Sequence, residues 1–125
     1  MIFKRTEGFR FVFGDPITAN FVLLLNGKPE NGKQSCSILD VSPHGMKMFS
    51  KTEIGEYRNK VVQIEIHFIL DEVLIKAVGE LVWKKNFGKD FHYGIVFENQ
   101  PIVEDLIVSE LKVRRKKEVK RAAKI

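Results

Sequence analysis

Hydrophobic and polar residues alternate along much of the first hundred positions, which is the pattern of half-buried β-strands. Residues 61–69 give the clearest example, because every second position from Val62 onward is apolar. His67 lies on the opposite, polar face of this segment, and we expect it to be exposed to solvent. The same reasoning predicts further strands over residues 17–25, 33–41, 46–49, 73–84 and 91–97.

Turn-forming residues separate these segments. Asn26-Gly27, Pro29 and Asn31-Gly32 together predict the connection after the first strand. Ser42-Pro43-His44-Gly45 and residues 86–90 predict two more loops. Gly79 interrupts a strand pattern, so a bend or bulge is expected there.

At Pro101 the period of the apolar residues changes from that of a strand to that of a helix. The apolar positions are Ile102, Val103, Leu106, Ile107 and Leu111. Proline is tolerated in the first turn of a helix, and Glu104 and Asp105 suit the positive end of its dipole. Short strands followed by one terminal helix predict a mainly β fold, an antiparallel barrel or sandwich that the helix closes or covers.

Composition is that of one folded domain: 125 residues, 44% of them hydrophobic and 30% charged. Cys36 is the single cysteine, so an intrachain disulfide is excluded, and its place in an alternating strand predicts a buried thiol. No apolar run is long enough to span a bilayer, and the first residues do not resemble a secretory signal. We therefore expect a cytoplasmic protein.

The formal net charge of +5 is concentrated at one end. Eight basic residues and Glu118 give residues 111–125 a net charge of +7, which leaves −2 for residues 1–110. The simplest interpretation is a solvated, frayed helix end whose cations favour the negative end of the dipole. The alternative is an anionic partner, either an acidic protein patch, lipid headgroups or nucleic acid. Nucleic acid is the least expected, because no aromatic residue follows Phe97 to stack on bases.

Catalytic chemistry is not indicated. The three histidines, His44, His67 and His92, lack metal-ligand spacing, and a lone cysteine makes no zinc pattern. Phosphate-binding glycine motifs are also missing from the sequence. We expect a binding protein with no catalytic residue, no metal and no cofactor.

Asp40, Ser42 and Gly45 form an Asp-x-Ser-x-x-Gly motif where a strand runs into a turn. A carboxylate can accept hydrogen bonds from a guanine, and a nearby arginine can bind guanine or phosphate. Glycine can adopt positive φ and let a ligand approach the backbone. The alternative is a capped turn, in which Asp40 and Ser42 bond the local backbone and Gly45 closes the bend.

The order of these elements resembles the PilZ domain family. That family places an Arg-x-x-x-Arg motif before the first strand and Asp-x-Ser-x-x-Gly about 30 residues later. Residues 79–83 and 92–97 are similar to its last barrel strands, and a C-terminal helix follows as it does there. The resemblance covers nearly the whole chain. It implies a six- or seven-stranded antiparallel β-barrel that binds cyclic di-GMP and signals to a protein partner.

The resemblance also implies the binding residues, which are Arg5, Arg10, Asp40, Ser42 and Gly45. Arg10 matches the second arginine of the first motif, but Thr6 stands where the first arginine belongs and Arg5 comes one residue early. A one-residue shift in an extended segment turns a side chain to the opposite face.

Three functions therefore stay open: a cyclic di-GMP receptor, a PilZ-like interaction adaptor that has lost nucleotide binding, and, least expected, a nucleic-acid binder that uses the basic tail. In each case we expect one domain over residues 1–125. It would comprise an arginine-bearing segment (1–13), a barrel (14–98) and a helix with a basic tail (101–125).

Overall fold

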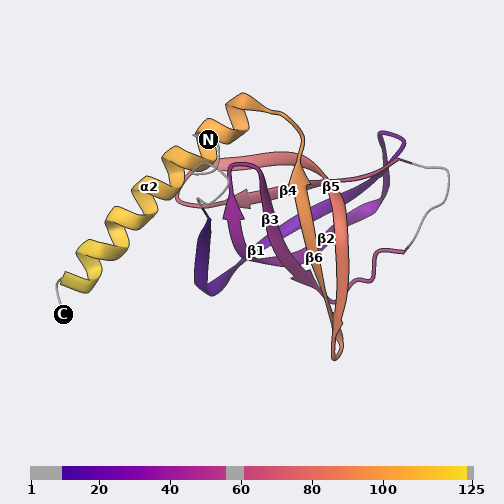
Figure 1. Cartoon of the computed structure of the whole chain (residues 1–125), viewed down its shortest axis with the longest axis horizontal. Coiled ribbons are helices and arrows are strands. Elements are labelled where there is room, and N and C mark those ends of the chain that lie inside the picture. Colours follow the sequence, from indigo (N-terminus) through magenta and orange to yellow (C-terminus); the bar gives the residue numbers. More distant parts are fainter. Residues whose placement is uncertain (1–9, 56–60, 124–125) are drawn as a thin grey trace, which may run out of the picture.

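The computed structural model describes residues 10–55 and 61–123. Within these ranges six antiparallel strands close into a barrel, and one helix follows them (Figure 1). The elements are β1 (Phe11–Leu25), β2 (Lys28–Ser42), β3 (Gly45–Ser50), β4 (Val62–Ile69), β5 (Leu74–Phe87), β6 (Asp90–Phe97) and α2 (Pro101–Ala123). The order around the barrel is β1-β2-β3-β6-β5-β4, and β4 closes it by pairing with β1. The predicted mainly β fold with a C-terminal helix is confirmed.

Alternation places one row of apolar side chains from each strand inside the barrel, whereas other apolar residues, such as Val12, Val82 and Val96, are exposed. In β4, Ile64, Ile66 and Phe68 are buried as expected. His67 is also buried, with 8% of its surface exposed, so its predicted exposure is wrong. It lies between Asn20 of β1 and Lys76 of β5, and its Nε2 is 2.7 Å from a carboxylate oxygen of Glu65. His67 thus belongs to the polar side of the β4 alternation, but neighbouring side chains on the outer surface of the barrel cover it.

The first hairpin is tighter and longer than expected. Asn26 and Gly27 have φ angles of 53° and 80°, which makes a two-residue turn of the kind that suits the twist of paired strands. Pairing resumes at once, with Lys28 opposite Leu25. The turn expected at Asn31-Gly32 is therefore wrong, because both residues lie within β2. Strand β1 begins at Phe11, ahead of the expected barrel boundary at residue 14.

Gly79 lies in a regular part of β5, and the irregularity predicted there is found between Leu81 and Trp83 instead. A Cβ atom added to Gly79 would lie 2.6 Å from the carbonyl oxygen of Val96. Glycine at this position permits the close approach of β5 and β6, which explains why it interrupts an otherwise regular pattern.

Helix α2 covers one end of the barrel through both apolar and polar contacts. Ile107 and Leu111 are buried in the core. Glu110 is 7% exposed, and one of its carboxylate oxygens accepts hydrogen bonds from three backbone N–H groups of the β4–β5 turn. These donors are Asp71, Glu72 and Val73, at 3.2, 2.9 and 2.9 Å.

Two basic residues extend this attachment toward the helix C-terminus. Arg114 donates a hydrogen bond to the carbonyl of Leu70 at 2.8 Å, and its guanidinium lies 5.0 Å from the ring centroid of Phe13. The Lys117 ammonium is 2.9 Å from Asp71, and this hydrogen bond raises the pKa of Lys117. Arg114 and Lys117 are thus attached to the β4–β5 turn and do not belong to a frayed end, although Lys117 stays half exposed to solvent. We call Glu110, Arg114 and Lys117 the docking face of α2.

Candidate functional site

Arg10 and Asp40 meet where β1 begins and β2 ends. Arg10 immediately precedes β1, and Asp40 lies near the end of β2, where Val12 is its partner across the ladder. An Nη1 of Arg10 donates to Oδ1 of Asp40, and the ammonium of Lys47 on β3 is 3.9 Å from Oδ2. The Asp40 side chain is 9% exposed whereas that of Arg10 is 45% exposed. A buried carboxylate therefore holds a half-exposed guanidinium in place.

Ser42 and Gly45 are used differently from Asp40, because both shape the turn between β2 and β3. The Ser42 hydroxyl accepts from the N–H of His44 at 3.2 Å and is 3.4 Å from the carbonyl of Gly45, to which it donates. Gly45 does not adopt the positive φ that glycine permits. A Cβ on Gly45 would lie 2.4 Å from the carbonyl oxygen of Ile95, so glycine is required by the close approach of β6.

Trp83 is a site residue that the sequence motifs do not indicate. Its indole lies across Gly94 of β6, where an added Cβ would be 2.1 Å from the indole nitrogen. The two residues are partners in the β5–β6 ladder, directly after its register shift. The Lys85 ammonium lies 5.7 Å from the Trp83 ring centroid, and Trp83 as a whole is 37% exposed. In the sequence, the Gly-x-x-x-Trp spacing of residues 79–83 places a glycine near Trp83. The pairing of β5 with β6 shows that the indole covers Gly94 and not Gly79.

These groups line one shallow hollow of about 310 Å³. Its lining comes from the segment before β1 and from strands β2, β3, β5 and β6: Arg10, Asp40, Met46, Lys47, Val82, Trp83, Gly94, Ile95 and Val96. The volume is at the lower end for ligand pockets, about 300–1,000 Å³. Of the expected binding residues, Arg10 and Asp40 line the hollow, Ser42 and Gly45 form the adjacent turn, and Arg5 lies outside the described residues.

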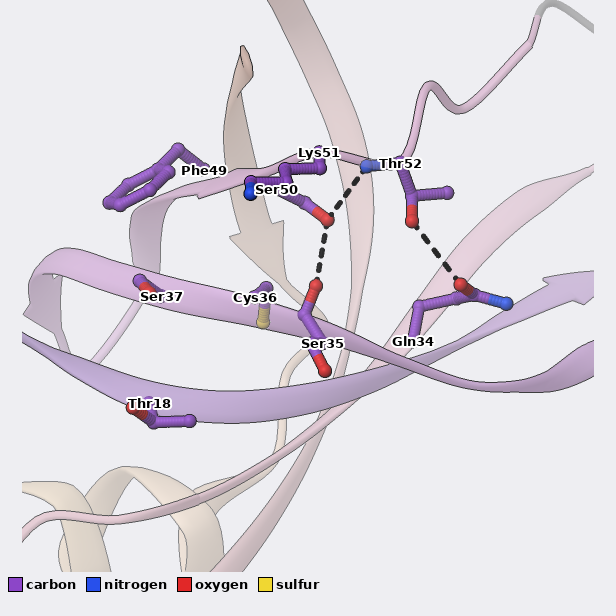
Figure 2. Close-up of a pocket in the computed structure, with 9 residues that line it drawn as sticks. All are labelled: Thr18, Gln34, Ser35, Cys36, Ser37, Phe49, Ser50, Lys51 and Thr52. Carbon is purple, nitrogen blue, oxygen red and sulfur yellow. Dashed lines mark hydrogen bonds between the residues drawn. The ribbon is translucent and has the colours of Figure 1, made fainter. Parts of the chain in front are cut away.

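A second hollow, of about 360 Å³, lies farther along β1, β2 and β3 (Figure 2). Its polar groups mostly bond one another. The Ser50 hydroxyl donates to the carbonyl of Ser35 at 2.7 Å and accepts from the N–H of Thr52, while the Thr52 hydroxyl donates to the side chain of Gln34. Lys51 is the one charged residue in its lining. This hollow has less to offer an anionic or purine ligand than the hollow at Arg10.

Buried ionisable groups elsewhere are not poised for chemistry. Burial raises the pKa of the Cys36 thiol to about 12, so the thiol is neutral and unreactive at physiological pH, as its predicted burial implies. Burial also raises the pKa of Tyr93, whose hydroxyl donates to the carbonyl of Thr52 and accepts from the N–H of Ile54.

Across residues 10–55 and 61–123, no three His, Cys, Asp or Glu side chains gather as a metal site would require. In the same ranges no helix is long and apolar enough to cross a membrane.

Comparison of the sequence with models of known protein families identifies the family of this barrel. The PilZ domain family matches residues 4–115, which is most of the chain. The chain belongs to the PilZ domain family. A search among curated proteins found no match.

PilZ domains are generally receptors for cyclic di-GMP, and they act as binding or adaptor domains rather than as catalysts. The two PilZ motifs lie far apart in the chain, yet Arg10 from one bonds Asp40 from the other across 30 residues. The barrel thus brings together the one described arginine of the first motif and the carboxylate of the second.

Proposed function

We propose that this PilZ domain binds cyclic di-GMP in the hollow at Arg10 and Asp40, and that a protein partner reads the bound state. The main support is the Arg10–Asp40 pair in the same hollow as the exposed face of Trp83. A guanine nucleotide needs cations for its phosphates, hydrogen-bonding groups for its base edge and a flat surface for its ring. This hollow offers all three.

Arg10 is suited to the anionic part of the ligand. Its guanidinium has five N–H donors, and the hydrogen bond to Asp40 uses one of them. The remaining donors can form the bidentate hydrogen bonds typical of arginine, either to a phosphate or to the O6 and N7 atoms of guanine. Asp40 and Lys47 add a carboxylate and a second cation beside it. Because Asp40 is nearly buried, its main contribution is to orient Arg10.

Trp83 is suited to the base. The indole covers Gly94 and is partly exposed, and base–aromatic stacking contributes about 1–3 kcal/mol per base. Lys85 near the ring adds positive charge at the same place. A small hollow of this kind would hold one end of a cyclic dinucleotide. We expect Arg5, which precedes Arg10 in the sequence, to contact another part of the ligand.

The proposal is tested by calorimetric titration of the full chain with cyclic di-GMP, with GTP as the control. Binding heat is expected for cyclic di-GMP alone, together with a rise in melting temperature. A ligand at 100 times its Kd stabilises the native state by roughly 2.7 kcal/mol. No heat and no thermal shift at millimolar cyclic di-GMP would contradict the receptor function.

That negative result would favour the second candidate, an interaction adaptor with the same barrel and no nucleotide site. The observation that supports this candidate is Thr6 at the position of the family's first arginine. An adaptor would bind its partner equally well with and without cyclic di-GMP, whereas a receptor would bind it differently in the two cases.

A further inference from the structure

Helix α2 has a second charged face, which the barrel does not use. The docking face points to the β4–β5 turn, whereas Lys112, Arg115, Lys116 and Lys120 lie with Val119 on another side of the helix. We call these five residues the outer face. Within the described ranges, none of its four cations forms an ion pair, and all four are exposed.

The outer face is a single surface with an apolar floor. Its residues line a shallow hollow of about 480 Å³, in which Val119 is 61% exposed between the stems of the basic residues. Residues 112 to 120 rise about 12 Å along the helix axis at 1.5 Å per residue. Long basic side chains can lay their methylene stems on apolar surface while the charged ends reach outward. The charges therefore surround an apolar strip.

The position of the helix restricts what can cover this face. The C-terminal half of α2 projects away from the barrel (Figure 1), and all five residues of the outer face are exposed within the described part of the chain. Four exposed cations on one projecting helix face can engage a broad anionic surface together. An acidic protein would need carboxylates at matching positions along the helix to do the same. The lack of aromatic residues after Phe97 leaves nothing to stack on nucleic acid bases.

An anionic phospholipid surface matches both features of the outer face. Its phosphates attract clusters of four or more lysines and arginines on an exposed helix. The glycerol and upper acyl region below the phosphates accepts an apolar strip between snorkelling cations. We propose that the outer face of α2 binds the surface of anionic membranes, with the helix lying on the bilayer and the barrel beside it.

Vesicle co-sedimentation of the full chain tests this surface. The vesicles are phosphatidylcholine alone, or phosphatidylcholine with 25% phosphatidylglycerol, at 50 and 500 mM salt. Binding is expected to the anionic vesicles at 50 mM salt and to be at least tenfold weaker at 500 mM, since salt screens exposed charges. Equal binding to neutral and anionic vesicles, or no binding to either, would overturn the proposal.

Two matched variants then locate the binding surface. Changing Lys112, Arg115, Lys116 and Lys120 to Gln is expected to weaken binding to the anionic vesicles at least tenfold. The control changes four exposed barrel lysines to Gln: Lys28, Lys33, Lys76 and Lys89. Both variants lower the formal net charge from +5 to +1. Less than a threefold loss is expected for the control, and an equal loss in both would mean that overall charge, not this face, drives binding.

Two further polyanions distinguish the membrane from other occupants. A 20-base-pair DNA duplex and poly-glutamate are titrated at 50 mM salt against the same protein. The proposal predicts weaker binding to each than to the anionic vesicles, compared at equal concentrations of anionic groups. Tighter binding to either would overturn the membrane assignment. Circular dichroism of both variants checks that the helix and barrel are unchanged.

Discussion

Two nearly buried carboxylates, Asp40 and Glu110, have opposite surroundings. Glu110 accepts three backbone N–H groups with one oxygen and closes the contact between α2 and the β4–β5 turn. Asp40 holds a guanidinium that is half exposed and has donors to spare. Similar burial thus serves two purposes. A carboxylate that receives backbone donors stabilises the fold, while one that holds an exposed arginine leaves that arginine's other donors free at the surface.

The largest expected effect is on stability, from Glu110→Ala. The change removes the acceptor of three backbone N–H groups, and a buried donor without a partner costs about 1–3 kcal/mol. Because water reaches part of the turn, we expect a total loss of about 3 kcal/mol in the free energy of unfolding, measured by urea denaturation. Glu118→Ala on the same helix is the control. It removes only an exposed i,i+4 pair with Arg114, worth about 0.3–0.5 kcal/mol. Equal losses of unfolding free energy in the two variants would mean that Glu110 contributes no more to stability than an exposed ion pair.

The next largest effect is on ligand affinity, from Arg10→Ala. Charge-assisted contacts of a guanidinium contribute about 1.5–3 kcal/mol, so affinity for cyclic di-GMP should fall by about a hundredfold. The melting temperature should change little, because the side chain is half exposed. Arg114→Ala is the informative partner variant, since it should lower stability and leave affinity within threefold. The reverse pattern would show that the roles of the two arginines have been assigned the wrong way round.

Asp40→Ala should have a somewhat smaller effect on affinity, about thirtyfold, because Asp40 acts mainly by orienting Arg10. The fold should survive with a melting temperature within a few degrees of the parent. Asp15→Ala, at an exposed position of β1, controls for the lost negative charge. If Asp40→Ala unfolds the domain, the carboxylate belongs with Glu110 as a structural group.

The smallest effect concerns the arginine that departs from the family spacing. Arg5→Ala should weaken binding by about tenfold, which corresponds to about 1.4 kcal/mol for one charge-assisted contact. Thr6→Arg in the Arg5→Ala background should restore the affinity, because it returns the charge to the family's spacing before Arg10. Titration of both variants decides the matter: if Arg5→Ala binds as the parent does, Arg10 alone serves the first motif.

Strand positions could be predicted from the sequence because alternation depends on neighbours only two residues apart. The hollow could be predicted only in part. Arg10 and Asp40 were expected to act together, but their direct bond depends on the pairing of β1 and β2. Trp83 reaches Gly94 only because the β5–β6 register shifts just before it. The register between two paired strands cannot be predicted from the local sequence pattern of either strand.

The docking face of α2 was missed for a different reason. Glu110, Arg114 and Lys117 share the helical spacing of Ile107 and Leu111, so they lie along the buried stripe and its continuation. The net charge of residues 111–125 does not show this division, because a sum over the segment does not distinguish one helix face from another. Sorting those residues by helix face would have separated the docking face from the outer face.

The central claim is that cyclic di-GMP binds at Arg10 and Trp83, and amide-resolved NMR titration tests it most directly. Trp83 is the only tryptophan, so its indole N–H gives a single resolved signal. On addition of cyclic di-GMP, that signal and the backbone amide of Gly94 should shift. The amides of Asp71, Glu72 and Val73, held by Glu110, should stay in place. Shifts confined to the hollow around Ser50 and Thr52, or no shift of the indole at saturating ligand, would contradict the account.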